Sequence, residues 1–139
     1  MVKFKSLVII LFLGAIALAT ITSCEKDEGK LPDISFKTGG SYVSADTTLP
    51  IGSTVTMGID AAKTEDKDVL KRFNISKSIN GGTAESVFDK DLSGSEGDNY
   101  SYDFTTTLDS VANQVNRYTF TVTNRDGLTN QVSLSITLQ

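Results

Sequence analysis

Residues 118–139 read Tyr-Thr-Phe-Thr-Val-Thr-Asn-Arg-Asp-Gly-Leu-Thr-Asn-Gln-Val-Ser-Leu-Ser-Ile-Thr-Leu-Gln, and this stretch indicates the fold. Apolar and polar residues alternate in residues 118–122 and again in residues 132–138, which is the period of a strand with one buried face. Between the two runs, Asn124 to Gly127 has the composition of a tight turn. The stretch therefore predicts a β-hairpin at the end of the domain.

The same alternation recurs upstream at intervals of roughly ten residues, with turn residues between the runs. Tyr42-Val43 and residues 47–49 are expected to pair only at an edge, because Pro50 lacks an N–H donor. Residues 62–68 and 89–99 are expected to form loops, and residues 108–115 a turn of helix or a crossover loop. The other predicted strands cover residues 33–36, 54–61, 69–79, 83–88 and 100–105.

Short strands without a long helical pattern are typical of a β-sandwich. The stretch Tyr118-x-Phe120-x-Val122-x-Asn124-x-x-Gly127, with the alternating strand after it, resembles the closing hairpin of Ig-like domains of the PKD and bacterial Ig-like kind. The resemblance implies an all-β fold, a seven-stranded antiparallel Ig-like β-sandwich. The cysteine pair and tryptophan of antibody domains are absent, since the chain has one cysteine and no tryptophan.

The first residues have the layout of a secretory signal peptide. Lys3 and Lys5 precede an apolar run over residues 7–19, and small residues follow. A transmembrane anchor is the alternative, but the run falls short of the roughly 20 apolar residues that cross a bilayer. We therefore predict a cleaved signal.

Ile21-Thr22-Ser23-Cys24 resembles the lipobox of bacterial lipoproteins, and Cys24 is the only cysteine in the chain. The resemblance implies cleavage before Cys24, lipidation of its thiol and a membrane anchor. The division of the chain that follows is a signal peptide over 1–23, a lipidated cysteine and charged linker over 24–32, and the sandwich domain over 33–139.

The next four residues, Glu25, Lys26, Asp27 and Glu28, resemble the lysine-plus-acidic export tag of surface lipoproteins in glycan-foraging Gram-negative bacteria. That resemblance implies display on the outer face of the outer membrane. The alternative is an ordinary solvated linker.

Composition argues against most enzyme classes. The chain has no histidine, which removes the commonest general base and zinc ligand. Asp66 and Asp68 lie among lysines, so solvated turns explain them. Asp89-x-Asp91-x-Ser93-Gly94 resembles the start of a calcium loop, but Tyr100 stands where the pattern requires glutamate. We expect no catalytic residues, no metal and no cofactor.

The net charge of −4 makes a nucleic-acid partner unexpected, because such binding depends on Lys and Arg contacts to phosphates. We expect a non-catalytic lipoprotein that is a binding or structural module in a cell-envelope assembly, with edge strands as the natural contact for a protein partner. The alternative is a glycan-binding accessory of a polysaccharide-uptake system, for which Tyr42 is the one aromatic expected to be exposed.

Overall fold

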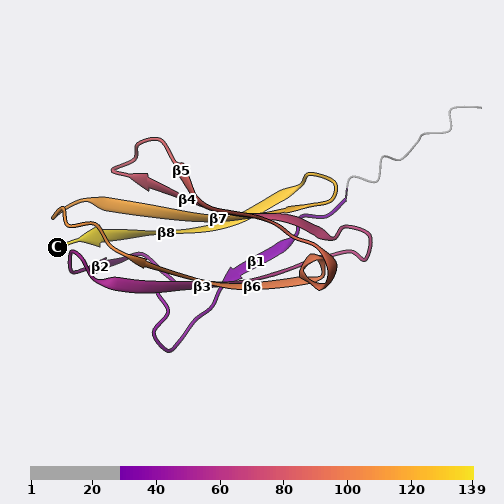
Figure 1. Ribbon diagram of the computed structural model, residues 1–139, viewed down its shortest axis with the longest axis horizontal. Coiled ribbons are helices and arrows are strands. Elements are labelled where there is room, and N and C mark those ends of the chain that lie inside the picture. Colours follow the sequence, from indigo (N-terminus) through magenta and orange to yellow (C-terminus); the bar gives the residue numbers. More distant parts are fainter. Residues whose placement is uncertain (1–28) are drawn as a thin grey trace, which may run out of the picture.

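The computed structural model describes residues 29–139, which contain eight strands and one short 3-10 helix (Figure 1). The helix η1 spans Gly94–Gly97. The strands are β1 (Asp33–Phe36), β2 (Thr47–Leu49), β3 (Thr54–Ala62), β4 (Leu70–Ile79), β5 (Glu85–Asp91), β6 (Asn99–Thr107), β7 (Val115–Asn124) and β8 (Thr129–Leu138).

The strands form two sheets that pack face to face. One sheet has the order β1-β3-β6, and the other has the order β2-β8-β7-β4-β5. The predicted all-β sandwich is therefore confirmed, and it is compatible with the Ig-like resemblance.

Two details of the prediction are wrong. The described residues hold eight strands rather than seven, and the larger sheet is mixed rather than antiparallel, because β2 runs parallel to β8. The chain reaches β2 from β1 of the other sheet, so no hairpin sets the direction of β2. Alternation within a strand carries no information about the direction of its neighbour, so the sequence pattern could not show this pairing.

The predicted closing hairpin is confirmed. Strands β7 and β8 pair in continuous register from Val115–Thr137 to Thr123–Thr129. The Asn124 side-chain oxygen accepts hydrogen bonds from the backbone N–H groups of Asp126 and Leu128 at 3.1 and 2.9 Å. Gly127 takes a φ of 81°, a conformation that glycine adopts without steric cost.

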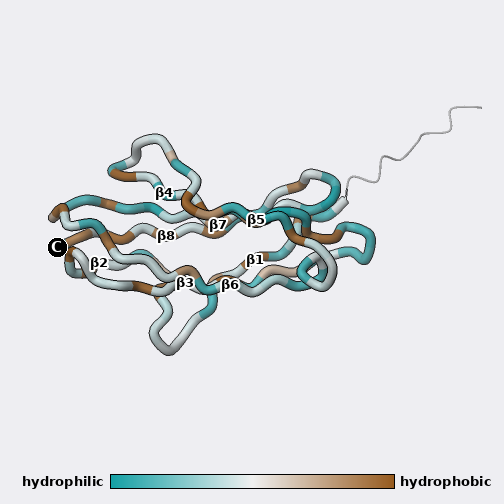
Figure 2. Tube along the Cα trace, viewed as in Figure 1, coloured by the Kyte–Doolittle hydropathy of each residue, from teal (hydrophilic) through white to brown (hydrophobic). Residues whose placement is uncertain are grey.

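The core lies between the sheets, where the alternating apolar side chains meet. Figure 2 shows hydrophobic stretches, in brown, interspersed with neutral and hydrophilic ones along the strands. Phe73, Phe120 and Tyr118 are almost fully buried, and rings from both sheets contact one another, as Phe36 and Phe120 do with centroids 5.4 Å apart. Such aromatic pairs contribute beyond the area that they bury.

Two of the predicted loops have other bounds in the structure than the sequence indicated. Strand β5 continues to Asp91, so the first residues of the expected 89–99 loop are in a strand. Arg72 of β4 pairs with Asp89 across the sheet, which explains why charged residues can continue an edge strand. Residues 108–114 form a crossover loop without a helix, in which Leu108 is buried and Asn113 takes a positive φ of 66°.

The sandwich has two ends with different loops. The described chain begins at Gly29, beside Asp68, Asp126 and Leu128, and we call this the near end. The carbonyl oxygens of Lys30 and Pro32 accept hydrogen bonds from Asn124 and Asn130, so residues 30–32 pack on the β7–β8 hairpin. The far end holds the C-terminus and the loops at residues 50–53, 80–84 and 108–114 (Figure 1).

Candidate functional site

The predicted lipidation site and export tag lie outside the described residues. These are Cys24, Glu25, Lys26, Asp27 and Glu28. Their roles, and the division of the chain at residues 23 and 32, stay predictions. The remaining candidates lie at the far end and on the three-stranded sheet.

Three exposed aliphatic side chains lie at the far end. Ile51, Ile79 and Val111 are 44%, 45% and 56% exposed. The backbone N–H of Gly52 donates to Asp109 O at 3.2 Å, and that of Leu108 donates to Ser53 O at 2.8 Å, so the first and third loops are joined. Asn80 N–H donates to Val115 O at 2.8 Å, which fixes the second loop to β7. We call these three side chains the far-end surface.

A network of polar side chains lies next to the far-end surface and is centred on Asp109. One oxygen of Asp109, Oδ2, accepts hydrogen bonds from Lys77 and Gln114 at 2.6 Å and from Asn116 at 3.0 Å. Asn116 and Gln114 are buried, so Asp109 satisfies donors that would otherwise be orphaned. The Lys77 hydrogen bond, against the opposing effect of burial, holds the pKa of Asp109 below its ordinary value. The network therefore holds the 108–114 loop in one conformation.

A second cluster lies on the outer face of the β1-β3-β6 sheet. Asp103 of β6 accepts hydrogen bonds from Lys37 Nζ at 2.6 Å and from the Tyr42 hydroxyl at 3.0 Å. Gly58 of β3 lies beneath them, because a Cβ there would meet all three side chains at 2.7–2.8 Å. The Lys37 hydrogen bond lowers the pKa of Asp103, and the hydrogen bond to Asp103 raises the pKa of Lys37 and of Tyr42. Tyr42 is half-buried rather than free, since the ring packs on the sheet.

The rest of this outer face is polar. Thr56 and Thr105 are joined by a side-chain hydrogen bond of 2.9 Å, and Thr54 and Thr107 by one of 3.3 Å. A cavity of about 590 Å³ lies against β1, β3 and β6. Its lining includes the polar residues Asp33, Ser35, Asp60, Asn99, Ser101 and Asn130. This surface offers hydroxyl, amide and carboxylate groups for hydrogen bonding.

The residues that resemble the start of a calcium loop lie in and after strand β5. Asp89 is paired with Arg72, and this hydrogen bond lowers the pKa of Asp89. Asp89 and Asp91 lie in β5, and Leu92 after them is buried. No three His, Cys, Asp or Glu side chains in residues 29–139 are placed to hold a metal ion. In the same residues, no helix is long and apolar enough to cross a membrane.

Asp66 and Asp68, both expected to be solvated, differ in their exposure to solvent. The Asp66 side chain is fully exposed, as expected, whereas the Asp68 side chain is 0% exposed and lies 3.6 Å from the Arg125 guanidinium. The sequence pattern around Asp68 is that of a turn, and its burial depends on the packing of Gly29 and of the β7–β8 turn over it.

Sequence reasoning missed both polar clusters. The one local signal was Gly58, since a glycine inside a strand pattern indicates a close approach by another group. The Asp109 network had no such signal, because its donors come from β4, from β7 and from the 108–114 loop.

Comparisons with known proteins bear on the fold alone. No protein-family model matches the chain, and no curated protein matches its sequence. Among solved structures, Spo0M, a sporulation control protein from Bacillus subtilis, is similar with a TM-score of 0.52 and 9% sequence identity. The match covers 79% of this chain and 50% of that chain, so this protein corresponds to about half of Spo0M. The likeness is one of β architecture.

Proposed function

We propose that this protein is a non-catalytic lipoprotein of the outer membrane, displayed on the cell surface through lipid at Cys24, which binds a protein partner in a cell-envelope assembly. Its fold is Ig-like in this proposal, with β2 as an added edge strand. The observation that carries the proposal is the far-end surface, three exposed aliphatic side chains at the end of the sandwich opposite Gly29.

Position and rigidity support this role. A domain tethered before Gly29 presents its far end away from the membrane. The Asp109 network and the loop-to-loop hydrogen bonds order the loops before binding, which lowers the entropy cost of association. Exposed apolar patches mark interaction sites, and Ile51 and Val111 stand on two loops that backbone hydrogen bonds join.

Affinity purification from cross-linked cells tests the partner. A fixed partner is expected with the native chain, and Val111→Glu and Ile51→Glu are expected to lose it, because each places a charge in the apolar contact. Leu31→Glu is the matched control, since Leu31 is 54% exposed but lies at the near end. Retention of the partner by both far-end variants, or equal loss in Leu31→Glu, would contradict the proposal.

Protease treatment of intact cells tests the location. Loss of the domain from intact cells is expected, because a surface lipoprotein is accessible to protease. Protection until lysis would mean that the domain faces the periplasm and that residues 25–28 are a linker.

The outer-face cluster favours glycan binding as a second candidate function. Tyr42 supplies an aromatic ring, and Asp103, Asp60 and the hydroxyl side chains supply groups that hydrogen-bond to sugars. In this alternative the protein is a glycan-binding accessory of a polysaccharide-uptake system.

Electrophoresis in polysaccharide-loaded gels tests the alternative. Retardation is expected for the native chain and for Tyr42→Phe, which keeps the ring, and Tyr42→Ala is expected to lose it. Normal mobility of the native chain, or retardation that persists in Tyr42→Ala, would exclude stacking on Tyr42.

A further inference from the structure

The sandwich has four edge strands, and three of them are protected against pairing with another chain. Strand β1 has 4 residues after Pro32, and β2 has 3 residues before Pro50. Strand β5 carries Glu85, Asp89, Lys90 and Asp91, and its pairing with β4 shifts register between Ile75 and Ser76. Short length, proline, charge and bulges are the features by which natural proteins protect sheet edges.

Strand β6 has no proline and no bulge, is not short, and carries a single charge, Asp103. It is 9 residues long and pairs with β3 in continuous register from Thr54–Thr107 to Ala62–Asn99. Its sequence, Asn-Tyr-Ser-Tyr-Asp-Phe-Thr-Thr-Thr, is rich in aromatic and β-branched residues and contains one charge. No strand of residues 29–139 pairs with its other edge. A long regular edge with free backbone groups is a template for another strand.

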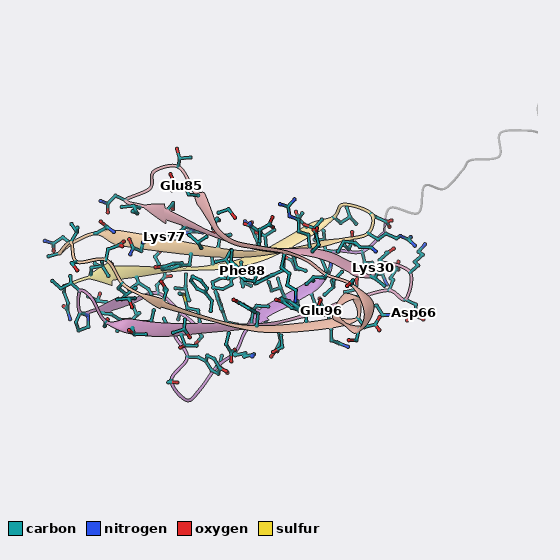
Figure 3. All side chains as sticks on the ribbon, in the orientation of Figure 1. Lys30, Asp66, Lys77, Glu85, Phe88 and Glu96 are labelled. Carbon is teal, nitrogen blue, oxygen red and sulfur yellow. The ribbon has the colours of Figure 1, made fainter. Side chains whose placement is uncertain are left out.

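The side of the sandwich next to this edge is lined by aromatic rings. Tyr102 of β6 stacks on Phe88 of β5 with ring centroids 4.5 Å apart and an interplanar angle of 27°. Phe88, Tyr102 and Phe104 are only half-buried. Figure 3 shows Phe88 between the two sheets. A strand added beside β6 would cover these rings with every second side chain.

The charges around the edge are neutralised within the domain. Residues 92–114 contain four acidic residues and no lysine or arginine. Each acidic residue is paired with a lysine from elsewhere in the chain: Glu96 with Lys90 at 2.5 Å, Asp98 with Lys63 at 2.7 Å, Asp103 with Lys37 at 2.6 Å and Asp109 with Lys77 at 2.6 Å. Because these carboxylates are already paired, the edge offers no unpaired charge to a charged strand. It therefore suits an uncharged strand, although the domain as a whole is acidic.

Tether geometry argues against a second copy as that strand. Two identical edges that face each other are related by a two-fold axis, so their strands run antiparallel. Two copies paired through β6 would have their near ends at opposite sides. Tethers at residue 24 could not then reach one membrane. This step rests on the proposed function.

We propose that the free edge of β6 accepts an extended, uncharged segment of another cell-envelope protein, with apolar side chains at alternate positions. Backbone hydrogen bonds to β6 provide affinity, and the apolar side chains of the segment pack on Phe88, Tyr102 and Phe104. This names the mode of binding for the partner of the proposed function, in addition to its contact with the far-end surface.

Fluorescence anisotropy with a designed peptide tests the site, with the full chain purified in detergent. The probe is a dye-labelled nonapeptide in which threonine alternates with valine and phenylalanine. We expect saturable binding. We expect at least tenfold weaker binding for a copy with every backbone amide methylated, and for a copy with the same residues sorted into apolar and polar blocks.

Matched protein variants locate the binding. Thr106→Lys places a charge on the half-buried inner side of the β6 edge and is expected to weaken binding at least tenfold. Thr47→Lys makes the same change at a half-buried position of the short edge strand β2 and is expected to bind normally. Thermal unfolding of both variants shows whether each is folded. If Thr106→Lys fails to fold, Thr105→Lys, on the exposed face of the same strand, replaces it.

Equal binding of the methylated peptide, or of the folded β6 variant, overturns the proposal, as does the absence of binding. A native chain that sediments as a dimer, and a β6 variant that sediments as a monomer, would identify a second copy as the occupant and overturn it too. If the peptide does not bind but Val111→Glu still loses the cellular partner, strand addition is wrong while the binding-module function stands.

Discussion

At the scale of single residues, each polar cluster depends on one residue that brings the other side chains together. Asp109 Oδ2 accepts three hydrogen bonds, two of them from the buried side chains of Gln114 and Asn116. Gly58 contributes by the absence of a side chain, since the Lys37–Tyr42–Asp103 cluster occupies the space of its Cβ. We therefore expect substitutions of Asp109 and Gly58 to have effects that substitutions of ordinary surface residues do not have.

Asp109→Ala is expected to lower the free energy of unfolding by about 1–3 kcal/mol, because the buried amide of Asn116 loses its acceptor and that of Gln114 keeps only Asn116 Oδ1. Asp91→Ala, an exposed carboxylate on β5, is the control and is expected to change it by less than about 0.5 kcal/mol. Chemical denaturation measures both. Equal stability of the two variants would mean that the network does not support the fold.

The pH dependence of stability tests the same carboxylate. Because the pKa of Asp109 is lowered in the folded state, its contribution is present above the ordinary carboxyl pKa of about 3.9 and is lost as the pH falls through the lowered pKa. Asp109→Asn is expected to show a shallower loss of stability in acid than the native chain. Identical acid profiles would contradict this.

Gly58→Ala is expected to displace Lys37 and Tyr42 from Asp103, since the new methyl group meets Lys37 Cδ and Tyr42 Cε1 at 2.7 Å. The pKa of Asp103 should then rise toward its ordinary value, which NMR titration of the carboxyl carbon measures. The change in stability should stay within about 1 kcal/mol, because alanine is favoured over glycine within a strand. An unchanged pKa of Asp103 would show that the cluster tolerates a Cβ.

At the scale of elements, the β7–β8 hairpin connects the near end to the core. Asn124 is 2% exposed, caps the turn through its side-chain oxygen and donates to Lys30 O at 3.0 Å. One side chain thus closes the hairpin and holds residue 30, next to the start of the described chain.

Asn124→Ala is expected to cost about 2–3 kcal/mol, because two turn N–H groups and one carbonyl lose their partner together. Thr129→Ala, an exposed residue of the same hairpin, is the control and should be nearly neutral. Hydrogen exchange of residues 124–130 should accelerate selectively in the asparagine variant. Unchanged exchange there would mean that backbone pairing alone holds the turn.

At the scale of the whole molecule, the proposed function assumes that one sandwich core stabilises the domain without disulfides or a metal ion. Calcium and EDTA are therefore expected to leave the melting temperature unchanged, since Asp89 is already neutralised by Arg72. Differential scanning calorimetry measures this. A rise with calcium and a fall with EDTA would restore a calcium role for residues 89–94.

Local sequence is enough to predict the strands and turns, because burial of one strand face imposes a period of two on neighbouring residues. Strand β1, the turns after Ile79 and Asn124, and the inward positions of Phe73, Ile75 and Phe120 follow from that local rule. The lipobox and export-tag resemblances are also local patterns, and they remain predictions.

Features that depend on residues far apart in the chain are set by the packing of the folded domain. The parallel pairing of β2 with β8, the burial of Asp68 and the free edge of β6 all depend on which strands become neighbours. The Asp103 cluster joins residues more than 60 positions apart. Periodicity shows which face of a strand is buried, but its partners are chosen by packing across the whole sandwich, so these features could only be seen in the folded molecule.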